Sequence, residues 1–386
     1  MAENQKQTFI PEFEAYIRAT EPDIRERADV WRTAIGLQQV DGLTVSDYLK
    51  QTAKRNIEGE ITIDETEQLV KTYYQSKAQR QPDDSGKEEA DRVSTNIARI
   101  LGEPSFTFSV AGLANIHRQI FAGVFSHAGQ FRQYDITKKE WVLRGDTVLY
   151  SHWEDLSATI AYDLEQEKCF NYTPLNRNQT VEHIASFVSG LWQIHPFEEG
   201  NTRTIAIFTI KYLRSIGFVQ INNALFEQHS WFFRNALVRA NYRNVQEGVN
   251  PDISFLTAFF RNLLYGEQHP LHNRYMHIAW RADSTKEDGK NKQVPNKYRT
   301  STEQVNCAEN ENVMLVVRCL GRNRLSQKEL MGKVGLRHRP TFIENYISPS
   351  INSGYVRLLY PDSPRHPRQK YLLTVKGLGL YNELTK

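Results

Sequence analysis

The chain has 386 residues, of which 40% are apolar and 24% charged, and its formal net charge is +3. This length is typical of two or three domains, and the apolar content is sufficient for packed cores. No apolar run approaches the roughly 18 residues of a membrane span, the first residues lack a signal-peptide pattern, and three scattered cysteines exclude a disulfide framework or a cysteine-based zinc site. We therefore expect a cytoplasmic protein that makes no membrane contact.

Residues 1–81 are expected to form an N-terminal helical region. Ser46 is suited to cap a helix that runs to Ile57 and stops at Gly59. Thr62-Ile63-Asp64-Glu65 has the capping-box pattern and predicts a second helix that ends near Tyr74. Neither helix carries an obvious catalytic group.

A polar loop is expected over residues 79–89, then a helix over 91–101 and another that begins after Ser109. Residues 130–153 differ from these, because they are rich in aromatic and β-branched residues and are interrupted by Lys-Lys-Glu and Arg-Gly-Asp turns. This pattern predicts a small β-hairpin on an otherwise helical scaffold.

The densest chemistry lies in residues 184–208, which read as a helix, a short polar turn and a second, mostly apolar helix. The turn holds an imidazole, two carboxylates, a glycine, an amide and a guanidinium between His195 and Arg203. A helix that begins near Gly200 directs its unpaired N–H groups into the turn, where a phosphate would bind. Glu199 is a hard oxygen ligand suited to Mg²⁺, and His195 can accept a proton near neutral pH.

The C-terminal third reads as two further helices and a separate module. Helices are expected over 230–240 and 253–265, and residues 281–304 have the polar composition of an interdomain linker. In residues 305–386, three helices followed by two strand-like runs resemble a winged helix. This module has 13 Lys/Arg against 6 Asp/Glu, which favours contact with DNA phosphates, although protein-binding modules are often basic too.

The nine residues from His195 to Arg203, His-Pro-Phe-Glu-Glu-Gly-Asn-Thr-Arg, resemble the signature loop of the Fic family, H-P-F-x-[D/E]-G-N-x-R. The resemblance implies a mainly α Fic (Fido) domain over 90–270 that transfers AMP from ATP to a Ser, Thr or Tyr hydroxyl of a protein, itself included. It implies His195 as the catalytic base and Glu199 as the Mg²⁺ ligand. The phosphate-binding residues would be Gly200, Asn201, Thr202 and Arg203.

The resemblance also assigns residues that would hold the target and the base. The expected hairpin matches the Fic flap, which aligns the target by strand-like pairing; its edge would be Ile136, Thr137, Trp141, Val142 and Leu143. Residues on the helix after the motif would pack against adenine, and the candidates by position are Phe233, Asn235 and Tyr242. Aromatic residues at helical spacing are also ordinary core residues.

Asn56-Ile57-Glu58-Gly59 is similar to the end of the inhibitory helix of Fic proteins and VbhA-type antitoxins, [S/T]-x-x-x-E-[G/N]. The similarity implies Glu58 as an inhibitory glutamate; the alternative is a solvated carboxylate at a helix end. Lys54 departs from the Ser or Thr of that pattern. Ala206 stands where the family has a second arginine that binds the inhibitory glutamate.

Ala206 also leaves the orientation of ATP open. In the reverse orientation, as the resemblance to Doc-type members implies, the hydroxyl would attack the γ-phosphate and the protein would be a kinase. A third alternative is a DNA-binding regulator whose Fic domain catalyses little. Retention of His195 and Glu199 favours an enzyme. The target is left open, and an oligomer is compatible with the sequence.

Overall fold

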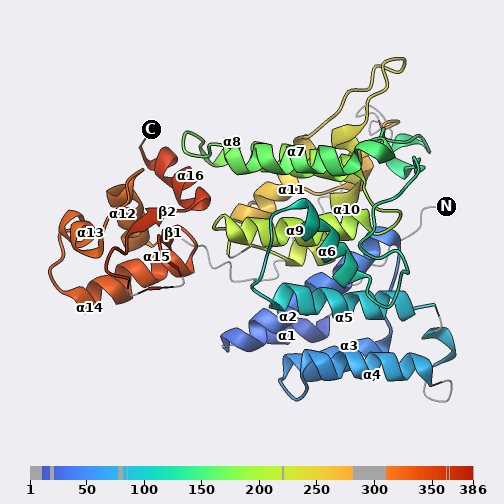
Figure 1. Ribbon diagram of the computed structural model, residues 1–386, viewed down its shortest axis with the longest axis horizontal. Coiled ribbons are helices and arrows are strands. Elements are labelled where there is room, and N and C mark those ends of the chain that lie inside the picture. The colour runs from blue at the N-terminus through green and yellow to red at the C-terminus, as the bar shows by residue number, and fades with distance from the viewer. Residues whose placement is uncertain are drawn as a thin grey trace, which may run out of the picture. The chain divides into compact units, whose positions relative to one another are not determined.

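The structure, a computed structural model, is mainly helical and contains one two-stranded antiparallel sheet (Figure 1). It describes residues 11–17, 21–76, 81–84, 86–219, 221–280, 310–361, 363–364 and 366–385. The expected fold class is confirmed in its mainly helical character. The expected linker over 281–304 lies outside the described residues.

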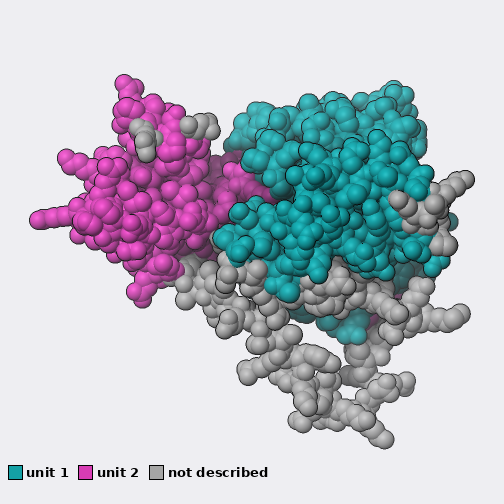
Figure 2. All heavy atoms as spheres, turned by 90° about the horizontal axis from the view of Figure 1, so that it is seen from below, with its two compact units in different colours: residues 1–169, 184–212, 221–278 teal, residues 170–183, 213–220, 279–386 magenta. Residues whose placement is uncertain are grey.

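The chain divides into two compact units, shown in teal and magenta in Figure 2. Unit 1 comprises residues 1–169, 184–212 and 221–278, and unit 2 comprises residues 170–183, 213–220 and 279–386. Unit 2 therefore includes two short segments that fall within the range expected for the Fic domain. Within the described residues, none of the helices combines the length and apolar character needed to span a membrane.

Unit 1 is a set of helices joined by short loops. Its elements are α1 (Pro11–Ile17), α2 (Pro22–Gly36), η1 (Leu37–Asp41), α3 (Asp47–Ile57), α4 (Ile63–Gln75), η2 (Pro82–Asp84), α5 (Glu88–Gly102), α6 (Val110–Ile120), η3 (Trp141–Leu143), η4 (Trp153–Asp155), α7 (Leu156–Cys169), α10 (Ala224–Asn241), α11 (Ser254–Tyr265) and η5 (Asn273–Met276). Helices α8 (Arg177–Ile194) and α9 (Asn201–Ser215) lie mostly in this unit.

The predicted helix starts of the N-terminal half are confirmed by their caps. The hydroxyl of Ser46 accepts a hydrogen bond from the N–H of Leu49, and Thr62 and Glu65 form both bonds of a capping box. The hydroxyl of Ser109 accepts from the N–H of Gly112 at the start of α6. These starts were predictable because each cap satisfies backbone donors within four residues.

Helix α9 occupies the middle of unit 1 (Figure 1). From Ile205 to Phe208 every side chain is at most 1% exposed, and Ile210 and Leu213 are fully buried. Neighbouring elements therefore cover α9 on all its sides. Its first turn, which follows the polar loop, is held in place by this packing.

The region expected to form a β-hairpin does reverse direction, but it contains no β-strand. The N–H groups of Glu140 and Gly145 donate to Asp146 O (2.9 Å) and Glu140 O (3.0 Å), and η3 forms the turn. The carbonyl of Val142 accepts from the N–H of Ile278 (2.9 Å). Because these backbone groups bond within the turn and to Ile278, and because Val142 and Leu143 are buried, a strand ladder does not form.

Unit 2 contains the expected three helical segments and hairpin. Its elements are α12 (Glu311–Leu320), α13 (Gln327–Val334), α14 (Arg339–Phe342), the π-helical turn η7 (Ile343–Ile347), α15 (Ser348–Asn352), β1 (Val356–Leu358), β2 (Tyr371–Leu373) and α16 (Val375–Leu384). The third predicted helix is thus broken, in part because Pro349 lacks the N–H of an uninterrupted helix. Helix α16 was not predicted.

Helix α16 ties the rest of unit 2 to the segments 170–183 and 213–220. The side chain of Asn382 donates to the carbonyls of Thr173 (2.8 Å) and Leu175 (2.7 Å). Arg177 forms an ion pair with Glu383 (2.9 Å). The N–H of Val375 at the start of α16 donates to Ile216 O (3.1 Å). These contacts explain why the two segments group with the C-terminal residues.

Asp91 on α5 joins three N-terminal elements through one buried carboxylate. It is fully buried and accepts hydrogen bonds from the N–H and hydroxyl of Ser46 and from the hydroxyl of Tyr74 (2.7 Å). Burial raises the pKa of Asp91 to about 6, and the three donors oppose that rise.

Replacement of Asp91 by alanine is expected to lower the free energy of unfolding by about 2–4 kcal/mol, because three buried donors lose their acceptor. Urea denaturation followed by circular dichroism measures the change. The exposed Asp83 supplies the control, since Asp83→Ala should change stability by less than about 0.5 kcal/mol. Equal effects of the two substitutions would contradict the role given to the buried network.

Candidate active site

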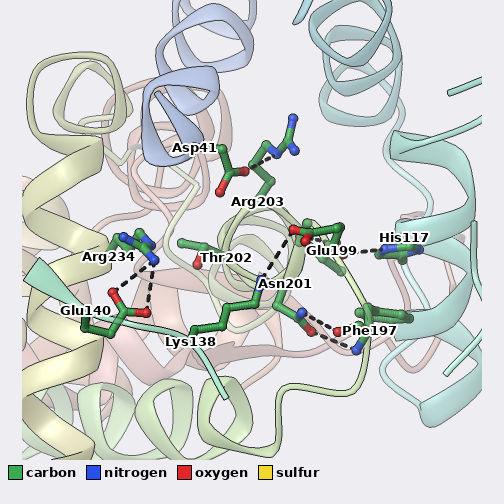
Figure 3. A network of polar contacts seen from close by, with 12 residues as sticks. Asp41, His117, Lys138, Glu140, Phe197, Glu199, Asn201, Thr202, Arg203 and Arg234 are labelled. Atoms are coloured by element: carbon green, nitrogen blue, oxygen red, sulfur yellow. Dashed lines mark hydrogen bonds and ion pairs between the residues drawn. The ribbon is translucent and has the colours of Figure 1, made fainter. Parts of the chain in front are cut away.

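The polar loop between α8 and α9 is closed by the side chain of Asn201. Its Oδ1 accepts from the N–H of Phe197 (2.9 Å) and its Nδ2 donates to the carbonyl of Phe197 (2.7 Å), as Figure 3 shows. Asn201 is 2% exposed. Both ends of the amide are thus engaged with the backbone of Phe197, and the backbone N–H of Asn201 lies in the first turn of α9.

Gly200 connects the loop to α9 in a conformation that needs glycine. Its φ is +75°, and a Cβ atom there would lie 2.1 Å from the ring of Phe121. The carbonyl of Gly200 accepts the backbone N–H of Thr204 (3.0 Å), so α9 begins directly after it. The first N–H groups of a helix have no partner within the helix, and they form an anion site with the positive end of its dipole.

His195 is buried beside this helix end. It is 3% exposed, has a φ of +51°, and packs its ring against Tyr150 (ring centroids 4.3 Å apart) and the edge of Trp192 (5.2 Å). In the described part of the chain, neither ring nitrogen has a hydrogen-bond partner. Burial, and then the charge of Lys138, lower the pKa of His195 well below its usual value. The ring is therefore neutral at pH 7 and able to accept a proton.

Arg132 fixes the backbone of the loop from the side of residues 130–140. Its side chain is fully buried and donates to the carbonyls of His195 (2.9 Å), Tyr134 (2.7 Å) and Ser151. Its backbone N–H donates to Pro196 O (2.9 Å). Arg132 is a positioning residue that the sequence analysis missed, because carbonyl groups leave no pattern in a sequence.

His117 on α6 fixes the other side of the loop. Its Nδ1 accepts the N–H of Gly129 (2.8 Å), so Nε2 carries the proton and donates to the carbonyl of Glu199 (3.0 Å). The ring stacks on Phe197 at 3.8 Å. Burial lowers the pKa of His117 to about 4, which keeps this neutral form at physiological pH. This residue was also missed, since its place on an apolar helix face is typical of core histidines.

The carboxylate of Glu199 is accessible, whereas its backbone carbonyl accepts the hydrogen bond from His117. The side chain of Glu199 is 58% exposed, and Lys138 Nζ lies 3.3 Å from Oε2 (Figure 3). Within the described residues, no three His, Cys, Asp or Glu side chains form a group that could hold a metal. A single carboxylate fits Mg²⁺, which is usually held by one or two carboxylates together with substrate phosphates.

Arg203 does not direct its guanidinium toward the loop amides. It forms ion pairs with Asp41 (2.8 Å) and Glu89 (2.9 Å) and donates to Gln38 (3.0 Å). Its side chain is 3% exposed. Arg203 thus connects α9 to η1 and α5. A phosphate could contact its guanidinium as expected only by displacing the carboxylates of Asp41 and Glu89. Thr202 is likewise engaged, because its hydroxyl accepts from Trp192 Nε1 (3.0 Å).

Residues 107–213, which include this loop, match the Fic/DOC family model. They form a Fic domain. Residues 311–374 match the model described as "Filamentation induced by cAMP protein Fic-like, C-terminal domain". His195 and Glu199 both lie inside the first match.

Relatives of this Fic domain include two named adenylyltransferases. Protein adenylyltransferase VbhT of Bartonella schoenbuchensis is 28% identical over 137 residues, which cover 33% of this chain and 27% of that protein. The probable protein adenylyltransferase Fic of Escherichia coli K12 is 27% identical over 154 residues, 39% of this chain and 68% of that protein. The chain thus spans about a quarter of the length of VbhT.

A solved structure of a Fic family protein from Desulfovibrio desulfuricans G20 also matches. It is 18% identical, with a TM-score of 0.42, and the match covers 94% of this chain and 93% of that chain.

The adenine-side residues expected from the Fic resemblance lie in the core of unit 1 or beside it. Phe233 is fully buried among Phe226 and Phe259. Asn235 is fully buried and donates to Asn273 (2.8 Å). Tyr242 is 3% exposed, and its hydroxyl donates to Asp146 (2.6 Å). All three are thus buried, and Asn235 Oδ1 has no hydrogen-bond partner within the described residues. Their contact with a base stays a prediction.

The expected flap edge is partly corrected. Val142 and Leu143 are buried in the 3₁₀ turn η3, so they offer no strand edge. Trp141 is half exposed, Thr137 is exposed and Ile136 is partly exposed. The accessible residues of this segment are therefore Trp141 and those of the first arm, which also carries Lys138.

Glu58 lies at the C-terminal end of α3, where it is exposed and accepts a hydrogen bond from Tyr16 of α1. The carboxylates that pair with the motif arginine are those of Asp41 and Glu89 instead. The Fic loop thus does meet N-terminal carboxylates, but they are not the one that the resemblance implied.

Replacement of Gly200 by alanine is expected to lower the free energy of unfolding by about 2–4 kcal/mol, because the new Cβ meets Phe121 and the backbone is strained. Gly145→Ala is the matched control, since Gly145 has a φ of +89° and open space around the added Cβ. The control should cost about 1 kcal/mol, from backbone strain alone. Similar losses for both variants in urea denaturation would show that the Phe121 contact is not what requires glycine.

Proposed function

We propose that this protein is an adenylyltransferase that moves AMP from ATP to a Ser, Thr or Tyr hydroxyl of a protein, self-modification included. The observation that carries the proposal is His195, a buried neutral imidazole with unpartnered nitrogens beside the start of α9. Proton transfer and phosphate binding are thereby available within one loop. The names of the relatives VbhT and Fic support the same reaction.

The phosphates of ATP would bind at the N–H groups of the first turn of α9. Glu199 would hold Mg²⁺ there after release from Lys138, and the bound ion would neutralise phosphate charge. His195 accepts the proton of the target hydroxyl as the oxygen forms a bond to the α-phosphorus. The bond from the α-phosphorus to the bridging oxygen breaks, and pyrophosphate leaves with the electron pair. The exposed arm of the flap at Thr137 is where we place the target segment.

A specific observation keeps the kinase alternative. Ala206 is fully buried and Arg203 is bound by two carboxylates, so α9 supplies no cation that distinguishes the two ends of the triphosphate. If the γ-phosphate lay at the site of attack, the same hydroxyl would take a phosphoryl group and ADP would leave.

Labelling with ATP distinguishes these reactions. Incubation with a lysate and ATP labelled at the α-phosphate should leave label on protein. ATP labelled at the γ-phosphate should leave no label on protein. The variant His195→Ala should reduce labelling from the α-phosphate at least 100-fold, which is the scale of general base catalysis. The exposed His272 provides a control variant, His272→Ala, which should label normally. Retention of γ-label alone would establish a kinase. Absence of both labels, with salt-sensitive DNA binding by the basic unit 2, would favour a regulator.

The pH dependence of kcat/KM for the transfer should also reflect the buried base. Because the pKa of His195 is lowered, the ring stays neutral as the pH falls, and the half-maximal point of the acidic limb should lie below pH 6.5, the ordinary value for histidine. Initial rates of labelling between pH 5 and pH 8 measure this profile. A half-maximal point at or above 6.5 would contradict the assigned environment of His195.

A further inference from the structure

The start of α9 offers amides but no available cation to the phosphates of a nucleotide. Arg203 is bound by Asp41 and Glu89, and Ala206 has neither charge nor exposure. A triphosphate carries several negative charges, and proteins usually meet them with arginine or lysine as well as a metal ion. The cation must therefore come from another element.

Besides burial, three cations outside α9 lower the pKa of His195 through their charge, namely Lys138, Arg132 and Arg234. Arg132 is unavailable, since its side chain is fully buried and donates to backbone carbonyls. Lys138 lies 3.3 Å from the carboxylate of Glu199, the group that would hold Mg²⁺, so a bound metal ion would repel its charge from this position. Arg234 on α10 remains, with its side chain 18% exposed.

Arg234 is held in a way that leaves part of its guanidinium free. Nη2 contacts both carboxylate oxygens of Glu140, at 3.0 Å and 2.9 Å, and the guanidinium lies over the ring of Trp231 at 5.2 Å. In the part of the chain that the structure describes, Nη1 and Nε have no hydrogen-bond partner. Figure 3 shows Arg234 and Glu140 on the opposite side of the loop from His117, with Thr202 between Arg234 and Glu199.

Within the described residues, Arg234 is the ion-pair partner of the Glu140 carboxylate. Glu140 is 1% exposed, burial raises its pKa, and the charge of Arg234 opposes that rise. A carboxylate removed from water is costly unless it is paired. The pair is therefore a fixed support that positions Arg234 beside the loop.

We propose that Arg234, held by Glu140 and Trp231, binds the terminal phosphates of the nucleotide and supplies the cation that α9 lacks. The inference rests on the proposed function and assigns a new phosphate-binding residue to that site. The N–H groups of Nη1 and Nε can donate charge-assisted hydrogen bonds to phosphate oxygens. Because AMP lacks the terminal phosphates, it does not need this residue.

Binding of ATP and of AMP should separate this role from a structural one. In the His195→Ala background, which prevents turnover, Arg234→Gln should weaken Mg²⁺–ATP binding at least tenfold in isothermal titration calorimetry and change AMP binding less than twofold. Arg234→Lys should recover part of the ATP affinity, because it restores charge without the planar geometry. The exposed Arg243 gives the control, since Arg243→Gln should bind both nucleotides normally.

The substitution leaves Glu140 buried without its partner, so a double variant, Glu140→Gln with Arg234→Gln, checks that the fold is not the cause. It should show the same selective loss of ATP affinity. Equal weakening of ATP and AMP in both variants, or unchanged ATP binding in Arg234→Gln, would overturn the inference while leaving the labelling result intact. Failure of the His195→Ala parent to bind ATP at all would overturn the proposed function as well.

Discussion

The candidate site depends on two hydrogen bonds between the side chain of Asn201 and the backbone of Phe197. They close the loop across the first turn of α9 and bring His195 and Glu199 to the same helix end. Both bonds are buried, where an amide without its partners would be costly. The loop can therefore keep strained features, including the positive φ of His195, because the surrounding contacts determine its shape.

Contacts from distant parts of unit 1 support this loop. Arg132 binds its carbonyls on one side and His117 binds the carbonyl of Glu199 on the other. Each contact uses a side chain on a different element, and neither competes with the imidazole of His195. The imidazole is consequently positioned by its backbone, and its ring nitrogens have no hydrogen-bond partner within the described residues.

The charges around the loop are divided in an unexpected way. The motif arginine, Arg203, is used to bind the N-terminal carboxylates of Asp41 and Glu89, and it joins α9 to η1 and α5. Arg234, from α10, is held by Glu140 with part of its guanidinium open. Arg203 is thus engaged by carboxylates on two other elements, whereas Arg234 keeps part of its guanidinium unpaired within the described residues, and the signature alone does not reveal this division.

The sequence by itself determined the helix starts at Ser46, Thr62 and Ser109, the polar loop at His195 and the succession of three helical segments and a hairpin in residues 310–375. These features depend on residues within a few positions of each other, through capping, periodicity and turn chemistry. Only the tertiary structure decided that Phe233 is core, that Val142 is buried in a turn without strands, and that Arg203 faces Asp41 and Glu89. Those outcomes depend on burial and on ion pairs between residues more than a hundred positions apart, where a linear pattern carries no information about which surfaces meet.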